Sequence, residues 1–114
     1  MEINTQDYQI CYDPATATVS FIGYLRLSGP AEYTPIAELL TKVADLEQTK
    51  ITLNMQQLEF LNSSGINMLS KFIIEVRKTA RVQMAVQGSQ TIAWQGKSFK
   101  NFQRLMPALQ LEFL

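Results

Sequence analysis

After residue 34 the chain alternates between segments with helical hydrophobic spacing and short runs of strand-forming residues. Apolar side chains recur every three or four residues from Ile36 to Leu46, and again from Ile66 to Val76, which is the spacing of a buried helix face. A third helix is predicted at 98–106, where Pro107 stops it. The predicted strands are 51–55, 82–87 and 109–113. This alternation predicts right-handed crossovers and a largely parallel sheet with packed helices.

The first part of the chain follows a different pattern. Residues 8–12 and 18–27 are rich in β-branched and aromatic side chains, and the turn-forming sequence Asp13-Pro14-Ala15-Thr16 separates them. We expect a β-hairpin there. Thr34 followed by Pro35 predicts the start of the first helix, with the threonine as N-cap and the proline in the first turn. The predicted fold is therefore α/β, with an N-terminal hairpin before alternating helices and strands, in one domain spanning 1–114.

Composition excludes several classes of function. Ten basic and ten acidic residues give no net field that would hold a nucleic acid or an anionic membrane. The chain has no histidine, the commonest general base and zinc ligand, so we predict no catalytic residue, metal or cofactor. The single cysteine, Cys11, cannot form an internal disulfide, and no export signal or spanning segment is evident. A cytoplasmic protein is expected.

The turn Asn62-Ser63-Ser64-Gly65 lies where sites form in parallel sheets, between the end of a strand and the start of a helix. Its structural interpretation is helix capping, because a side-chain oxygen at the N-cap accepts a free N–H of the first turn. If Ser64 or Asn62 caps the helix, Ser63 is free at the surface, and Gly65 leaves room for another molecule to approach. A phosphate on Ser63 would add roughly −1.5 to −2 charges near the positive end of the helix dipole. Capping and a phosphorylation switch both remain open.

The polar side of the following helix contains one apolar residue. Ile74 projects among polar neighbours that include Asn67 and Lys71, so it is either a singly exposed side chain or part of a contact surface. Together with the turn 61–65, Asn67 and Ile74 define a candidate partner-binding surface.

Three further features have open or weak functional interpretations. Trp94, in a predicted loop at 88–96, is either an interface anchor or a lid over the core. Lys97, Lys100 and Arg104 share one side of the last helix, which suits a phosphate or an acidic partner but also an ordinary solvated face. Gly96-Lys97-Ser98 lacks the preceding glycine and strand of a phosphate-binding loop, so an NTPase is rejected.

The run from Ile51 through Leu58, Phe60 and Leu61 into Asn62-Ser63-Ser64-Gly65 resembles the signature of STAS domains, the anti-sigma-factor antagonist family. In that family a buried strand and a short hydrophobic lead-in precede Asp-Ser-Ser-Gly or Asp-Ser-Thr-Gly at the start of a helix. The resemblance implies a non-catalytic regulator whose first serine is phosphorylated by a kinase with a histidine-kinase-like ATP fold. A PP2C-type phosphatase reverses this, and the unphosphorylated form binds the kinase or an anti-sigma factor. The matching serine is Ser63, with Ser64 as the alternative.

Asn62 departs from the family pattern, which has aspartate at this place. Asparagine still accepts a backbone hydrogen bond, so the turn is expected to survive, but the negative charge beside the phosphoacceptor is lost. A kinase that recognises the carboxylate would bind less well. The alternative function is therefore a STAS-like adaptor or scaffold that is never phosphorylated.

Overall fold

One six-stranded sheet runs through the computed structural model, which describes residues 1–46, 48–79 and 81–114. In chain order its elements are β1 Glu2–Asn4, β2 Tyr8–Asp13, β3 Thr18–Leu25, α1 Pro30–Asp45, β4 Lys50–Leu61, α2 Ser63–Thr79, β5 Gln83–Gly88, α3 Ala93–Leu105 and β6 Gln110–Phe113. The strands lie side by side in this same order, with β1, β2 and β3 antiparallel and β3 to β6 parallel. The predicted α/β fold, with its hairpin and its parallel sheet, is confirmed.

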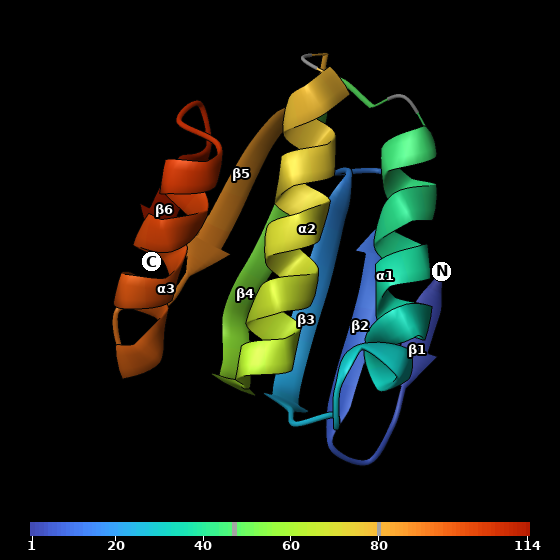
Figure 1. Cartoon of the computed structure of the whole chain (residues 1–114), viewed down its shortest axis with the longest axis vertical. Coiled ribbons are helices and arrows are strands. Elements are labelled where there is room, and N and C mark those ends of the chain that lie inside the picture. The colour runs from blue at the N-terminus through green and yellow to red at the C-terminus, as the bar shows by residue number, and fades with distance from the viewer. Residues whose placement is uncertain (47, 80) are drawn as a thin grey trace.

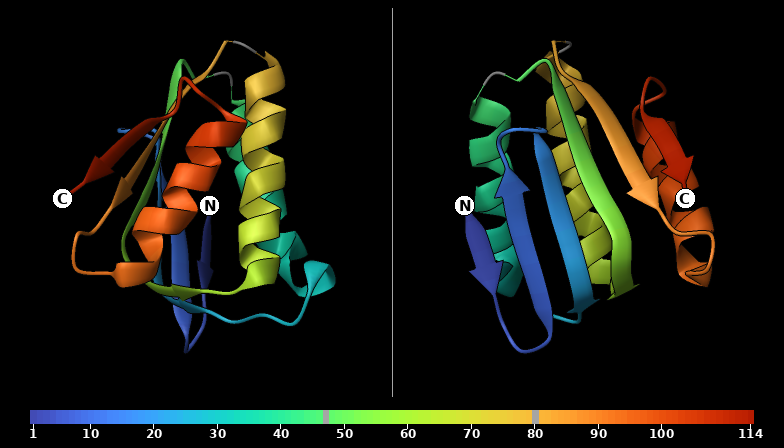
Figure 2. Two further views of the ribbon diagram at one scale, coloured as in Figure 1. Left: turned by 60° about the vertical axis from the view of Figure 1, so that its left-hand side comes forward. Right: turned by 180° about the vertical axis from the view of Figure 1, so that it is seen from behind.

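The helices α1, α2 and α3 cover one face of the sheet, and the view from behind shows the other face without a helix (Figures 1 and 2). Both predicted helical stripes face the core. The buried residues of the first two helices are Tyr33, Ile36, Leu39, Leu40 and Val43 in α1 and Gly65, Met68, Leu69, Phe72, Ile73 and Val76 in α2. Leu46, predicted for the first stripe, is 51% exposed because α1 has ended before it.

The first helix begins five residues earlier than predicted, at Pro30 rather than at Pro35 after Thr34. Gly29 precedes it with a φ of 93°, which glycine adopts without a steric cost, and Pro30 occupies the first turn, where its missing N–H is harmless. The Glu32 carboxylate accepts the backbone N–H of Ser28 and closes the start of the helix. Pro35 lies inside α1, so a second position of the helix, beyond the first residue, has no N–H donor.

Strand β4 is longer than predicted and includes residues 56–61. Pairing with β3 shifts twice, since Ser20 and Ile22 of β3 pair with Asn54 and Gln57, and a second shift follows Gly23. Each shift inserts one extra residue into β4, as in a β-bulge. The bulges change the spacing of core-facing side chains, so this half of the strand does not show simple alternation. They also carry Leu61 to the end of the sheet, directly before α2.

Two other boundaries differ from the predictions. Helix α2 begins at Ser63 rather than Ile66, and α3 begins at Ala93, so Trp94 and Gly96 lie in a helix rather than a loop. The edge strand β1 was not predicted, because three residues are too few to show a pattern. In the described ranges, no helix has the length and apolar character needed to cross a membrane.

Candidate partner-binding site

The side chain of Asn62 organises the turn between β4 and α2. Its Oδ1 accepts the backbone N–H of Gly65 at 3.0 Å, which makes Asn62 the N-cap of α2. Its Nδ2 donates to the Leu27 carbonyl at 2.7 Å, in the segment that links β3 to α1. Of the two predicted capping residues, the structure therefore uses Asn62 and leaves both serines free of that role.

Tyr33 of α1 reaches the same amide. Its hydroxyl lies 2.6 Å from Asn62 Oδ1 and 3.2 Å from the Leu25 carbonyl, and the side chain is only 1% exposed. Burial raises the pKa of Tyr33, so the hydroxyl remains a protonated donor well above neutral pH. The start of α2 is thereby fixed to α1 and to the end of β3.

Gly65 is buried beneath this turn, against the prediction that it leaves room for an approaching molecule. A Cβ at this position would collide with Leu61 Cδ1 and lie 2.8 Å from the Tyr33 hydroxyl. Leu61 itself is only 6% exposed. Gly65 and Leu61 therefore shape the turn from inside the chain, and the space left by the missing side chain is already filled.

The two serines occupy the first two positions of α2. Ser63 is exposed and Ser64 is half-buried, and within the described residues neither hydroxyl has a hydrogen-bond partner. The first-turn N–H groups of a helix point outward and favour an anion. Ser63 thus offers a free hydroxyl at a helix end that tolerates negative charge.

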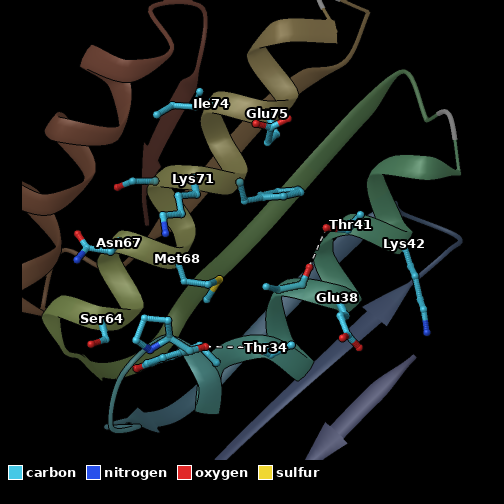
Figure 3. A pocket seen from close by; sticks show the side chains of 15 residues that line it. Thr34, Glu38, Thr41, Lys42, Ser64, Asn67, Met68, Lys71, Ile74 and Glu75 are labelled. Atoms are coloured by element: carbon cyan, nitrogen blue, oxygen red, sulfur yellow. Dashed lines mark hydrogen bonds between the residues drawn. The ribbon is translucent and has the colours of Figure 1, made fainter.

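A groove of about 740 Å³ lies between α1 and α2 and begins beside this turn (Figure 3). Ser64, Asn67 and Ile74 line it from α2, whereas Ser63 lies outside the lining. Ile74 is 36% exposed. The structure therefore brings three of the predicted surface residues to one groove wall, places Ser63 at the surface next to them, and puts Leu61 and Gly65 underneath.

The first turn of α3 contacts the second half of β4, away from this groove. Beyond Asn54, β4 no longer pairs with β5, and side chains from α3 donate hydrogen bonds to the carbonyls of β4 that this leaves free. Gln95, which is fully buried, donates from Nε2 to the Met55 carbonyl at 2.7 Å and lies 3.2 Å from the Leu58 carbonyl, while its Oε1 accepts the Ser89 N–H at 2.7 Å. Sequence reasoning missed this residue because a lone glutamine in a predicted loop gives no signal.

Trp94 has a structural role in the same contact. Its Nε1 donates to the Glu59 carbonyl at 2.9 Å, and its ring packs edge-on against Phe99 with 5.8 Å between centroids. The half-buried ring thus covers the core at the start of α3, which favours the second of its two predicted roles.

The basic residues of α3 do not join the groove. Lys97, Lys100 and Arg104 are exposed, and none of them lines the space between α1 and α2. Among the described residues no group of three or more histidine, cysteine or acidic side chains could hold a metal ion.

The fold and the sequence can be compared with known proteins. No curated protein matches the sequence. A chain in the crystal structure of diguanylate cyclase SiaD in complex with its activator SiaC from Pseudomonas aeruginosa aligns with a TM-score of 0.75 at 16% identity, over 100% of this chain and 99% of that chain. SiaC of Pseudomonas aeruginosa aligns with a TM-score of 0.71 at 15% identity, over 100% and 98% of the two chains. At such identities the likeness carries the fold alone. The STAS domain model matches residues 13–92, which include β3, α1, β4, α2 and β5, and the chain therefore belongs to the STAS domain family.

Proposed function

We propose that this protein is a non-catalytic regulator of the partner-switching type. It binds a protein partner, a serine kinase or an anti-sigma-like protein, through the turn 61–65 and the exposed side of α2. Phosphorylation of Ser63 releases the partner, and a PP2C-type phosphatase restores binding. The observation that carries this proposal is the position of Ser63, whose hydroxyl is exposed at the first position of α2 while Asn62 caps the helix.

The local chemistry favours a switch at Ser63. A phosphate there adds roughly −1.5 to −2 charges without displacing the cap, because Asn62 already accepts the Gly65 N–H. The charge lies at the positive end of the α2 dipole, so the folded chain tolerates it. A partner packs against this surface while Ser63 is unmodified. Once Ser63 carries a phosphate, like charges repel the partner, and burying the phosphate in the contact costs desolvation free energy.

The family and the structural neighbours support a regulatory protein contact. A chain with this fold occurs in a complex of a diguanylate cyclase with its activator, so the architecture is compatible with control of another protein. The sequence contains no histidine that could act as a general base and activate the Ser63 hydroxyl as a nucleophile.

A second function, a constitutive adaptor that is never phosphorylated, is favoured by one observation. Asn62 donates from Nδ2 to the Leu27 carbonyl at 2.7 Å, a bond that an ionised aspartate could not make. The turn has therefore adopted a neutral residue where a kinase of the family would meet a carboxylate.

One experiment separates these functions. Wild type, Ser63→Asp and Ser63→Ala are used as baits in lysate of the native host, and mass spectrometry identifies the partners and any phosphate on the wild-type bait. Asn101→Asp, at an exposed position of α3, controls for an added negative charge elsewhere. A kinase-like partner that binds wild type, Ser63→Ala and Asn101→Asp but not Ser63→Asp, with phosphate on wild-type Ser63, supports the switch.

Melting temperatures guard against a trivial loss of binding. Ser63→Asp is expected to melt within a few degrees of wild type, because the residue is exposed and near the helix dipole. If wild type and Ser63→Asp bind the same partner equally and wild-type Ser63 carries no phosphate, the phosphorylation switch is rejected and the constitutive adaptor is supported.

A further inference from the structure

The α1–α2 groove has an apolar floor. Ala37 of α1 and Met68 and Phe72 of α2 line it, and the last two side chains are less than a tenth exposed. Ile74 and the ring of Pro30 add apolar contacts at its edges. The floor therefore offers a strip of hydrophobic surface that follows the two helices.

Charged side chains of both signs form the rim of this groove. Glu38 and Lys42 stand on the α1 side, and Lys71 and Glu75 stand on the α2 side (Figure 3). In the parts of the chain that the structure describes, the one ion pair is Lys78–Glu75 at 3.2 Å, so Glu38, Lys42 and Lys71 make no ion pair there. Three of the four rim charges are therefore available to another molecule.

The charge order is opposite on the two walls. Helices α1 and α2 rise in the same direction, since each returns from one parallel strand to the next (Figure 1). Along that direction Glu38 precedes Lys42 on α1, whereas Lys71 precedes Glu75 on α2. Each pair is four residues apart, about one helical turn or roughly 6 Å.

The walls of the groove favour a helix as occupant. The backbone groups of α1 and α2 bond within their own helices, so the walls offer few donors or acceptors to an extended segment, whose own N–H and C=O groups would stay unpaired. A helix satisfies its backbone internally and lays one apolar stripe on the floor. Side chains four residues apart on such a helix are also separated by about one helical turn, the same spacing as the charged residues along each wall of the groove.

We propose that the α1–α2 groove is the docking site for an amphipathic helix of the protein partner, an inference that rests on the proposed function. The flank of that helix facing α1 carries a basic residue opposite Glu38 and an acidic one opposite Lys42. Its other flank carries an acidic residue opposite Lys71 and a basic one opposite Glu75. A shift by one turn would place like charges together, so the rim sets the axial register, as flanking charges do in coiled coils.

Site-specific photocrosslinking in the native host tests the occupant. A benzoylphenylalanine probe replaces Thr41 or Ile74 at the groove, or the exposed Lys100 of α3 as a control, each in the full chain. We expect the two groove positions to crosslink to the same partner, within one segment that carries a helical apolar stripe and the stated charges four residues apart. Crosslinks to an extended segment, to a second copy of this chain, or mainly from Lys100 would overturn the inference.

Charge reversal at constant net charge tests the register. Glu38→Lys combined with Lys42→Glu is expected to weaken binding of the crosslinked partner, purified, by about tenfold or more. Reversing the two opposed charges of the partner helix is expected to restore binding. Lys97→Glu combined with Glu112→Lys makes the same exchange at exposed positions outside the groove and should bind as wild type.

The outcomes separate this inference from the proposed function. If no protein crosslinks from any position and none is retained by the Ser63 baits, the proposed function fails and the helix with it. If a partner is lost on Ser63→Asp but binds the groove reversal as tightly as wild type, the proposed function stands and the helix in the groove is rejected.

Discussion

The Tyr33 hydroxyl lies 2.6 Å from Asn62 Oδ1, and this contact joins α1 to the capped end of α2. The same oxygen accepts the Gly65 N–H, while the amide nitrogen of Asn62 donates to the Leu27 carbonyl. The side chain is therefore used as both acceptor and donor. An ionised aspartate, the residue usual at this place in STAS domains, could supply only the acceptor half.

Substitutions of Asn62 should separate the contribution of its oxygen as acceptor from that of its amide nitrogen as donor. Asn62→Asp keeps the cap but faces the Leu27 carbonyl with a second oxygen, so we expect it to lower the free energy of unfolding by about 1 kcal/mol. Asn62→Ala loses the cap as well and should cost about 2 to 3 kcal/mol. Urea unfolding at pH 7 measures both. An aspartate variant as stable as wild type would show that the Leu27 bond contributes nothing.

Tyr33 should give the protein a specific sensitivity to alkaline pH. Burial raises the pKa of Tyr33 above its usual value near 10, so the unfolded chain ionises this hydroxyl before the folded chain does. Its contribution to stability is therefore complete below about pH 10 and is lost as the pH rises through the folded-state pKa. Tyr33→Phe should cost about 1 kcal/mol at pH 7 by loss of the hydrogen bond.

The measurement is the free energy of unfolding of wild type and Tyr33→Phe between pH 7 and pH 11. The difference between them should stay constant up to about pH 10 and shrink above it, because only wild type has this group to ionise. A difference that is constant over the whole range would contradict the prediction.

The parts of the fold that were predictable are those whose pattern is local. The apolar spacing from Ile36 to Val43 and from Met68 to Val76 specifies which helix faces are buried, and the alternation of elements specifies a parallel sheet. The exposure of Ser63 likewise followed from capping by its neighbour.

The parts that were missed depend on contacts distant in sequence. Residues 56–61 form a strand because β3 pairs with them across two bulges. Gln95 finds its acceptors 37 and 40 residues away, and no spacing within its own segment indicates them. The role of Gly65 depends on Tyr33, which a helix beginning after Thr34 would have left outside α1.

Removal of the buried amide of Gln95 should be among the most destabilising changes outside the hydrophobic core. Gln95→Leu keeps a similar volume but leaves the Met55 carbonyl and the Ser89 N–H without partners, so we expect a loss of about 3 kcal/mol. Gln90→Leu is the control, since Gln90 is exposed and water can replace its one bond to the Phe113 carbonyl. Equal urea midpoints for the two variants would show that these bonds do not stabilise the fold.

Two glycine-to-alanine substitutions in helices should have opposite effects. Alanine is the better helix former by about 1 kcal/mol. At Gly96 the added Cβ would meet no described atom within 4 Å apart from the neighbouring residues and backbone of its own helix, so Gly96→Ala should raise the free energy of unfolding by about 0.5 to 1 kcal/mol. Gly65→Ala gains the same preference but drives its Cβ into Leu61 and to 2.8 Å from the Tyr33 hydroxyl, so we expect a net loss of about 2 kcal/mol. Thermal and urea unfolding of both variants measure the contrast. If Gly65→Ala were stabilised as much as Gly96→Ala, Leu61 could move aside without cost, and the turn that presents Ser63 would not depend on a missing side chain at position 65.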